Sequence, residues 1–422
     1  MSHPHLPLVC FYFQVHQPYR LRDLRVTDIG HGAVDYFDHD KNRAIFRKVS
    51  EKCYLPANRL MLELVTQYPD FSIAYSLSGS FLDQCEEYGP DVLDSFRALA
   101  ATGKVEFLAE TYNHSLSSIK SVEEFCLQTK QHVQKIQELF GQTPKVFRNT
   151  ELIYSNELAQ FARLMGFSGM LTEGADHVMQ GRSPNAPFQP PSFWINPVQE
   201  QLIAKNRPLP ECADQIRVLL KNYKLSDDVA FRFSDKSWVG HPLHADTFTD
   251  WLMGSGGHSV NLFMDYETFG EHQWADTGIF EFLRTLPRFW QERGIRAATP
   301  SQVLAAWGNR PCDTFDVHNV ISWADLERDL SAWQGNLIQD ASLNAVYALE
   351  ADVKKSADPH LLQTWRRLQT SDHFYYMSTK YWSDGDVHKY FSPYDSPYEA
   401  YRRFSHALCD LKIRLQQHEL SS

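Results

Sequence analysis

Short apolar runs alternate with amphipathic helical segments along the first three quarters of the chain. The apolar runs have the length of buried strands, and the predicted strands are 8–15, 71–77, 104–109, 146–148, 169–172, 215–220, 229–233 and 260–264, with a last strand or strand end at 294–298. Helical periodicity between them predicts helices over 40–68, 91–102, 121–141, 156–165, 248–253 and 280–292, and a further helix that follows the turn 78–80 and runs through Leu82 and Cys85. This order of strand and helix indicates a parallel sheet with crossover helices.

A closed or nearly closed α/β barrel fits this pattern better than an open, doubly wound sheet. The alternating part spans roughly 300 residues, no GxGxxG follows the first strand, and acidic residues stand at several strand ends. Residues 180–207 are rich in Pro, Asn and Gln and are predicted to form a long surface excursion with one strand near 192–195.

The pattern changes after residue 305. Helices are predicted at 324–330, 343–352, 361–369, 371–381 and 397–419. We therefore expect two parts, a barrel over 1–305 and a helical region over 306–422 that packs on it.

Composition narrows the classes of function. The chain has 422 residues, 43% of them hydrophobic, and a formal net charge of −11 without a basic patch, which argues against a nucleic-acid partner. No apolar run approaches the ~20 residues of a membrane helix and the first residues lack a signal-peptide pattern, so we expect a cytoplasmic protein without membrane attachment. The seven cysteines include no CxxC pair and no loop has DxDxDG spacing, so neither a metal nor another cofactor is predicted.

Aromatic residues are numerous, with 10 Trp, 19 Tyr and 27 Phe. Most are expected in the core, but rings beside Asp, His and Asn would also suit a sugar-binding groove. The tryptophans in such surroundings are Trp194, Trp238, Trp251, Trp274, Trp323, Trp333 and Trp382.

The candidate chemistry lies at strand ends. Residues 260–274 place Asp265, Glu267, Glu271 and His272 directly after an apolar strand. His16 follows the first strand, a second polar group extends from Glu106 to His114, and Arg148 and Glu151 follow the strand 146–148. In a parallel barrel these ends emerge on one face, which would bring Glu151 and Asp265 together.

Two such carboxylates, one ionised and one protonated, are what glycoside cleavage requires. Arg148 would favour the charged form of Glu151, and burial against Tyr266 and Phe269 would raise the pKa of Asp265. Plainer interpretations stay open. His16 could be a structural histidine, Arg148 and Glu151 could form an ion pair at a helix start, and Glu106 could be a buried acid that braces the site.

These stretches also carry a family resemblance over nearly the whole chain. They read HQP at 16–18, GKVEFL at 103–108, FRNTELI at 147–153, FMDYETFGEH at 263–272 and, more weakly, SAWQGN at 331–336. With these motifs the chain resembles glycoside hydrolase family 57, the family of α-amylase-type and 4-α-glucanotransferase enzymes. The resemblance implies a (β/α)7 barrel, one strand short of eight, followed by a helical domain that completes the cleft.

The resemblance also implies roles for individual residues. Glu151 would be the nucleophile and Asp265 the general acid/base of a retaining double displacement on α-glucans, with carboxyls about 5–5.5 Å apart. His16, Glu106 and His114 would lie near the sugar, and Trp333 would reach in from the helical region. The predicted substrate-binding residues are His16, Glu106, His114, Arg148, Glu267, Trp274 and Trp333.

Three alternatives remain open at this point. A 4-α-glucanotransferase would use the same site, and the loose fifth motif, in which Asp329 stands four residues before Trp333, leaves hydrolysis and transfer unresolved. A non-catalytic protein that binds α-glucan or maltooligosaccharide could share the fold. A metal-dependent polysaccharide deacetylase is disfavoured. It would need an Asp-Asp pair near the first strand and an HxxxH-type pair, but His16 has no acidic neighbour and the sequence shows no such histidine pair.

Overall fold

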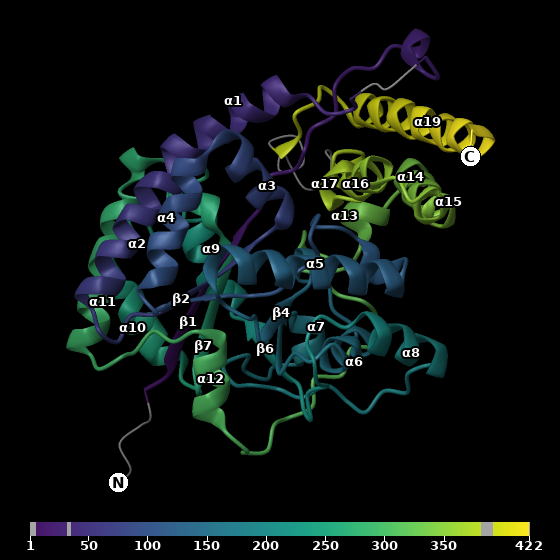
Figure 1. Ribbon diagram of the computed structural model, residues 1–422. Coiled ribbons are helices and arrows are strands. Elements are labelled where there is room, and N and C mark those ends of the chain that lie inside the picture. Colours follow the sequence, from purple (N-terminus) through teal and green to yellow (C-terminus); the bar gives the residue numbers. More distant parts are fainter. Residues whose placement is uncertain (1–5, 32–34, 381–390, 422) are drawn as a thin grey trace.

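Parallel strands surround the centre of the molecule in the computed structural model, which describes residues 6–31, 35–380 and 391–421 (Figure 1). The strands are β1 Leu8–Val15, β2 Ile73–Leu77, β3 Val105–Phe107, β4 Val146–Arg148, β5 Gly169–Glu173, β6 Arg217–Lys221 and β7 Ser259–Asp265. They pair in two arcs, in the orders β3-β2-β1-β7 and β4-β5-β6, and each ladder is parallel.

The two arcs meet at both ends and so form a barrel. Between β3 and β4, the backbone N–H of Ala109 donates to the Val146 carbonyl (3.0 Å) and that of Arg148 donates to the Ala109 carbonyl (2.8 Å). Between β6 and β7, the backbone N–H of Asn222 donates to the Asn261 carbonyl at 2.8 Å. The predicted fold class, an incomplete (β/α)7 barrel, is confirmed.

Helices cover the outside of this barrel. They are α1 His39–Val49 and α2 Leu55–Gln67, joined by the π-helical turn Ser50–Tyr54, then α3 Gly79–Tyr88, α4 Pro90–Ala101, α5 Val122–Phe140, α6 Asn156–Leu164, α7 Asp176–Met179, α8 Pro197–Asn206, α9 Tyr223–Ala230, α10 Ala245–Ser255, α11 Ile279–Glu292 and α12 Pro300–Trp307. Several begin at a residue whose side chain accepts from a free backbone N–H of the first turn, as Ser78, Ser121 and Ser155 do.

One end of the barrel is filled. Tyr12, Leu108 and Phe263 point inward and pack with Val303 and Leu304 of α12, which lies across the amino-terminal ends of the strands. A cavity can therefore open only at the carboxyl ends, where the predicted site residues stand.

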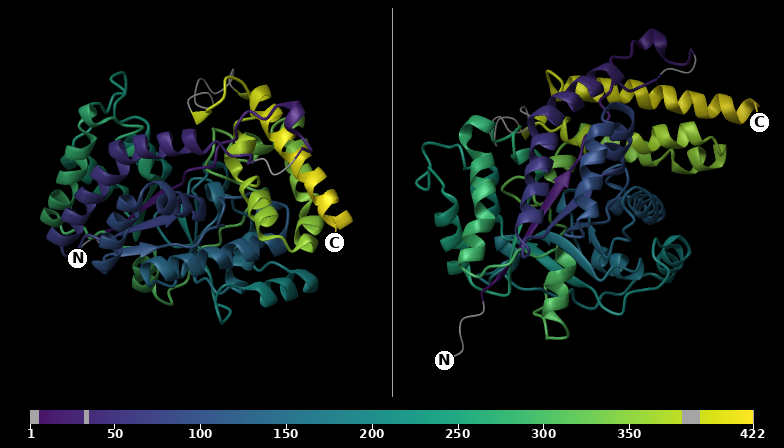
Figure 2. Two further views of the ribbon diagram at one scale, coloured as in Figure 1. Left: turned by 45° about the horizontal axis from the view of Figure 1, so that its top comes forward. Right: turned by 60° about the vertical axis from the view of Figure 1, so that its left-hand side comes forward.

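The C-terminal part is helical, as predicted. Its helices are α13 Ser331–Gln334, α14 Leu337–Tyr347, α15 Glu350–Ser356, α16 Pro359–Arg367, α17 Ser371–Tyr375 and α19 Pro397–Ser421. They lie together beside the barrel, and α19 runs along the segment that follows β1 (Figure 2). There Asp410 accepts from the Tyr36 hydroxyl and from the Gly30 backbone N–H, both at 2.7 Å. The predicted boundary between residues 305 and 306 falls inside α12.

Several predicted elements are wrong. Residues 229–233 are not a strand, because Asn222 caps α9, which continues to Ala230. Residues 192–195 are irregular, since two prolines precede them and cannot donate to a ladder. In the same excursion a helix, α8, begins after Asn196.

Two further differences lie later in the chain. Residues 324–330 are not helical, because Asp325 and Arg328 both have φ of 54°. Residues 294–298 contribute only a single parallel bridge, between Ala297 and Val9. The predicted helix 371–381 ends at Tyr375; its last residue, Tyr381, and Trp382 lie outside the described residues. In the described part of the chain, every helix is too short or too polar to cross a membrane.

Candidate active site

A cavity of about 300 Å³ opens at the carboxyl ends of the strands, and side chains from both the barrel and the C-terminal helices line it. Glu151 and Asp265 both face this cavity, although more than a hundred residues separate them in sequence. Four of the predicted substrate-binding residues line it as well: His16, His114, Glu267 and Trp333. The barrel therefore brings together most of the predicted site.

Glu151 stands in the tight turn Thr150–Leu152 just after β4, with a left-handed backbone (φ 57°) that non-glycine residues seldom adopt. Its Oε2 accepts from the indole Nε1–H of Trp323 at 2.8 Å. Its Oε1 lies 3.2 Å from both the Ser371 hydroxyl and His114 Nε2. Burial alone would raise the pKa of Glu151, but the hydrogen bond and charge of His114, with the charge of Arg148, hold it below its usual range.

Asp265 is the last residue of β7, where it pairs in register with Gln14 of β1. Burial, followed by the negative charge of Glu151, raises the pKa of Asp265 to about 6. The pKa values of the two carboxyls therefore differ. At a pH between them, Glu151 is ionised while Asp265 keeps its proton.

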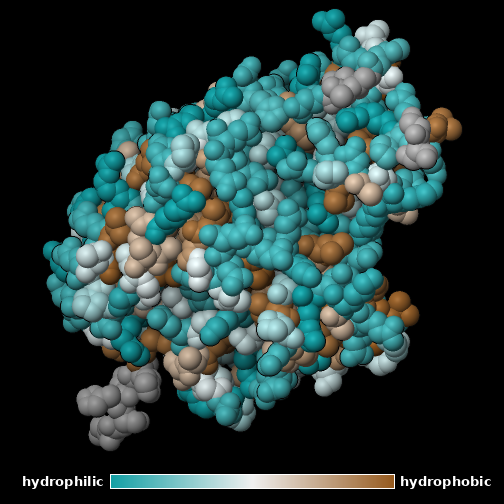
Figure 3. Space-filling model, viewed as in Figure 1, coloured by the Kyte–Doolittle hydropathy of each residue, from teal (hydrophilic) through white to brown (hydrophobic). Residues whose placement is uncertain are grey.

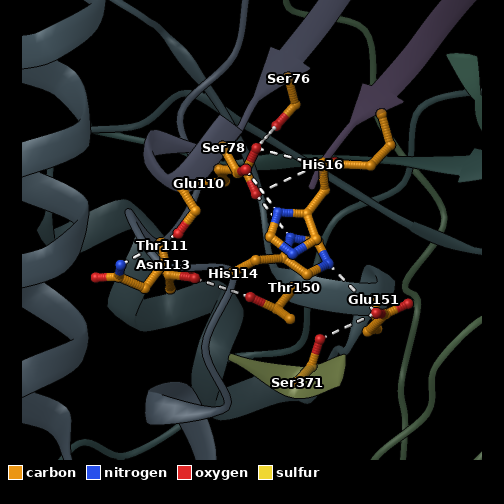
Figure 4. Close-up of polar contacts among 12 residues, drawn as sticks. His16, Ser76, Ser78, Glu110, Thr111, Asn113, His114, Thr150, Glu151 and Ser371 are labelled. Atoms are coloured by element: carbon orange, nitrogen blue, oxygen red, sulfur yellow. Dashed lines mark hydrogen bonds and ion pairs between the residues drawn. The ribbon is translucent and has the colours of Figure 1, made fainter. Parts of the chain in front are cut away.

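His114 joins Glu151 to a second, deeper carboxylate (Figure 4). Its Nε2 faces Glu151, and its Nδ1 lies 3.0 Å from Oε2 of Glu110, which is fully buried. Burial lowers the pKa of His114, but the hydrogen bonds and charges of Glu110 and Glu151 outweigh it and raise the pKa to about 9. His114 is therefore an imidazolium at neutral pH.

His16 is stacked on His114, with ring centroids 4.2 Å apart and planes inclined by 17°. Its Nδ1 lies 2.6 Å from the Ser78 hydroxyl and its Nε2 lies 3.1 Å from Asp372 Oδ2. Burial and the neighbouring His114 lower the pKa of His16, so a neutral ring lies against a charged one. Asp372 comes from α17, so the C-terminal helices contribute polar groups to the cavity.

Glu267 accepts a hydrogen bond of 2.5 Å from the Tyr54 hydroxyl, and Tyr54 in turn accepts from Gln17 Nε2 at 3.0 Å. Burial, followed by the charge of Asp265, raises the pKa of Glu267 to about 8. The cavity thus holds two nearby acids, Asp265 and Glu267, whose pKa values are both raised above those of ordinary carboxyl groups.

Arg148 lies behind the cavity wall rather than on it. Its guanidinium is fully buried, 5.1 Å from the Trp323 ring centroid, and no described residue accepts a hydrogen bond from it. Lys221 Nζ lies 5.3 Å from the same ring. Arg148 therefore acts on Glu151 through its charge and cannot be among the sugar contacts that we predicted.

Two other predicted sugar contacts lie elsewhere. Glu106 points toward the filled end of the barrel, where its carboxylate accepts from the Ser301 hydroxyl (2.5 Å) and backbone N–H (3.0 Å) at the start of α12. Trp274 is 59% exposed beside Lys52 and does not line the cavity. We remove both from the substrate-binding set.

Although Trp323 was noted among the tryptophans in polar surroundings, sequence reasoning gave no defined site role to four side chains that the structure brings to Glu151, His114 and His16. They are Glu110, Trp323, Ser371 and Asp372. Glu110 stood within the polar stretch 106–114, but the sequence offers no reason to prefer it over Glu106. Ser371 and Asp372 open a short helix before an aromatic cluster, a pattern that also fits ordinary helix capping.

Comparison with known proteins gives consistent results. Residues 10–318 match glycosyl hydrolase family 57. A protein of Methanocaldococcus jannaschii, named "Putative alpha-amylase", is 40% identical over 97% of this chain and 85% of its own length. The solved branching enzyme of the same family from Thermococcus kodakaraensis superposes with a TM-score of 0.64 at 14% identity, over 95% of this chain and 88% of that one.

The 4-alpha-glucanotransferase from Thermococcus litoralis superposes with a TM-score of 0.61 at 16% identity. The match covers 87% of this chain but only 56% of that protein, so this chain spans just over half of its length. At such identities the two superpositions support the fold alone.

Proposed function

The chain belongs to glycosyl hydrolase family 57, and from that premise we propose that it cleaves α-1,4-glucans by a retaining double displacement, as an enzyme of the α-amylase type. The observation that carries the proposal is the pair Glu151 and Asp265, which line one cavity and hold their protons with different strength. A retaining glycosidase needs this division between an ionised nucleophile and a protonated acid.

In the first step, a carboxylate oxygen of Glu151 attacks the anomeric carbon of the bound sugar. The bond from that carbon to the bridging oxygen breaks, and Asp265 transfers its proton to the departing oxygen. The product is an ester between Glu151 and the glycosyl group, and the other part of the glucan leaves with a new hydroxyl.

The second step uses the same residues in reverse. Ester formation removes the negative charge of Glu151, which is one of the causes that raise the pKa of Asp265. Asp265 then accepts a proton from the incoming hydroxyl, whose oxygen attacks the anomeric carbon and displaces Glu151. Two inversions at this carbon leave the original α configuration.

The remaining polar residues of the cavity are assigned to binding. His16, Asp372 and Glu267 carry hydrogen-bonding groups at the cavity surface, and Trp333 lines it from α13. Sugar hydroxyls need such donors and acceptors, while an aromatic ring can pack against an apolar sugar face.

Transfer to a second sugar is the alternative, because water and a sugar hydroxyl compete for the same ester. The ring of Phe231 favours this candidate: it is 61% exposed although it lines the cavity, so it offers an apolar surface on which an acceptor sugar could stack. The same chemistry would then make a 4-α-glucanotransferase.

Incubation with maltoheptaose, followed by analysis of product lengths and of reducing ends, separates these outcomes. Hydrolysis gives shorter products and more reducing ends, whereas transfer gives both shorter and longer products at a constant number of reducing ends. Unchanged maltoheptaose that binds to the protein would identify a non-catalytic binder and overturn the proposal.

Two variants test the assigned roles. Glu151→Gln should lower kcat by orders of magnitude and leave binding of maltooligosaccharide detectable. Asp265→Asn should be equally poor on maltoheptaose but should react with an α-maltosyl fluoride and accumulate the ester on Glu151, since fluoride leaves without a proton. Glu106→Gln, which changes a half-buried acid at the other end of the barrel, is the control and should keep wild-type turnover.

A further inference from the structure

Glu110 is a buried carboxylate that does not reach the cavity. It follows β3 and is fully inaccessible to solvent. Its Oε1 accepts from the Ser76 hydroxyl (2.6 Å) and from Gln14 Nε2 (3.2 Å), and its Oε2 faces His114 Nδ1 at 3.0 Å. Figure 4 shows Glu110 and Glu151 on opposite sides of the His114 ring.

We propose that Glu110 is a positioning residue, which acts through His114 to hold the nucleophile Glu151 ionised and correctly oriented. This inference rests on the proposed role of Glu151. It concerns a residue that touches neither the cavity nor the substrate and that the family motifs quoted above do not single out.

Hydrogen-bond geometry supports the proposal. Both ring nitrogens of His114 face a carboxylate oxygen, Nδ1 at 3.0 Å and Nε2 at 3.2 Å. A neutral imidazole carries a single N–H, so one nitrogen would then point its lone pair at an anion. Between two ionised carboxylates, the doubly protonated ring satisfies both contacts. Each carboxylate therefore stabilises the positive charge of the ring and with it the N–H that the other carboxylate accepts.

The position of His114 is fixed from several sides. Its backbone has φ of 50°, and its carbonyl accepts from the backbone N–H of Ser371 at 2.9 Å. The stacked ring of His16 covers one face of its imidazole. Glu110 is the partner that fixes its rotation, because a ring without a bond at Nδ1 could turn away from Glu151.

The other charged groups around Glu110, His114 and Glu151 do not replace Glu110. Arg148 favours the ionised form of Glu151 from behind, whereas Asp372 opposes it. His132 contacts Glu110, but its Nδ1 accepts from the Glu110 backbone N–H at 3.3 Å and its Nε2 donates to the Leu77 carbonyl at 2.7 Å, which describes a neutral ring. The titratable and charged groups that act on Glu110, His114 or Glu151, or that are acted on by them, include Tyr12, His16, His132, Arg148, Asp265, Asp372 and Tyr375.

Glu110→Gln is the test, because it keeps the size of the side chain and an oxygen for Ser76 while it removes the charge. We expect the acidic limb of kcat/KM, which reports ionisation of Glu151 in the free enzyme, to move upward by about one pH unit or more. On that limb this shift is a loss of about tenfold in kcat/KM. Glu110→Asp keeps the charge and should restore the position of the limb.

The matched control is Glu106→Gln. Glu106 stands on β3, four residues before Glu110, and its carboxylate is held by Ser301 at the opposite end of the barrel. It should leave the pH profile unchanged. A merely structural role of Glu110 would lower the melting temperature without moving the acidic limb, and that result would overturn the proposal.

A measurement on the wild-type protein covers the case in which Glu110→Gln does not fold. With 15N-labelled histidine, both ring nitrogens of His114 should have the chemical shifts of an imidazolium at pH 7, whereas a neutral ring would overturn the proposal. Failure of the proposed function is distinguishable, because it would appear as wild-type turnover in Glu151→Gln. An inactive Glu151→Gln together with an unmoved limb in Glu110→Gln would refute only the role of Glu110.

Discussion

Glu267→Gln should make the protein more stable at alkaline pH, because Glu267 is a carboxyl group held in its neutral form. The side chain is 8% exposed, stands two residues beyond Asp265 and accepts a hydrogen bond of 2.5 Å from the Tyr54 hydroxyl. Glutamine has the same shape and an oxygen that can accept this hydrogen bond. The substitution therefore removes only the ability to ionise.

The size of the effect follows from the pKa of Glu267, which burial and the charge of Asp265 raise from 4.5 to about 8. In this interval the unfolded chain releases a proton that the folded protein retains, so the free energy of unfolding of the wild type falls as the pH rises. Relative to a side chain that cannot ionise, Glu267 lowers the free energy of unfolding by about 1 kcal/mol at pH 5 and by about 4 kcal/mol at pH 8. The variant avoids this cost, so its advantage should grow by about 3 kcal/mol between the two pH values.

Urea unfolding at pH 5 and pH 8 measures this difference directly. The matched control is Glu271→Gln, which removes a carboxylate that pairs with Lys48 Nζ (2.6 Å) and Lys52 Nζ (3.4 Å). Because both lysines are about half exposed, this control should be destabilised by about 1 kcal/mol or less, with the opposite sign. If Glu267→Gln is no more stable than the wild type at pH 8, Glu267 is not a neutral buried acid and the reasoning fails.

Four further outcomes are expected. The profile of wild-type kcat/KM against pH should be bell-shaped. Asp265 should set a basic limb near pH 6, and Glu151 should set an acidic limb below pH 4.5. A basic limb above pH 8 would contradict these roles. Trp323→Phe keeps a ring beside Arg148 but loses the Nε1–H that donates to Glu151, so kcat should fall about tenfold or more at an unchanged melting temperature. Gly270→Ala should lower the free energy of unfolding by about 3 kcal/mol or more, because φ is 114° and the new Cβ would meet the Lys52 carbonyl. Gly141→Ala is its control: φ is 67° and the space around it is open, so the loss should be about 1 kcal/mol. Activity should survive EDTA, since in the described part of the chain no three His, Cys, Asp or Glu side chains form a group that could hold a metal ion.

The barrel and its carboxylate pair could be predicted because their signals are local. A strand buried on both faces is a continuous apolar run, as in β1 and β7, and the chain leaves it with polar residues at the edge where the site forms. Parallel pairing then places all such ends on one side. Asp265 and Glu151 were found in this way, without knowledge of any contact between them.

The choice between Glu106 and Glu110 shows where such reasoning stops. Both belong to one short polar stretch, but Glu106 stands within β3, whereas Glu110 stands three residues beyond its end at Phe107. Glu106 consequently points to α12, while Glu110 points to His114. The periodicity of a three-residue strand cannot reveal this difference, and the partner of each acid comes from a distant part of the sequence.

The same limit explains why the C-terminal helices matter more than their sequence suggests. Among the described residues, three side chains lie within hydrogen-bond distance of the Glu151 carboxylate: His114 from the barrel, Trp323 from the segment after it, and Ser371 from α17. Asp372, the next residue of α17, is the partner of His16. Two of the three groups that orient the proposed nucleophile therefore come from beyond residue 318, where the family match ends. A barrel without the chain beyond residue 318 would keep both proposed catalytic carboxylates but would leave Glu151 with His114 as its one partner of these three, so the position of the proposed nucleophile depends on how the C-terminal part packs.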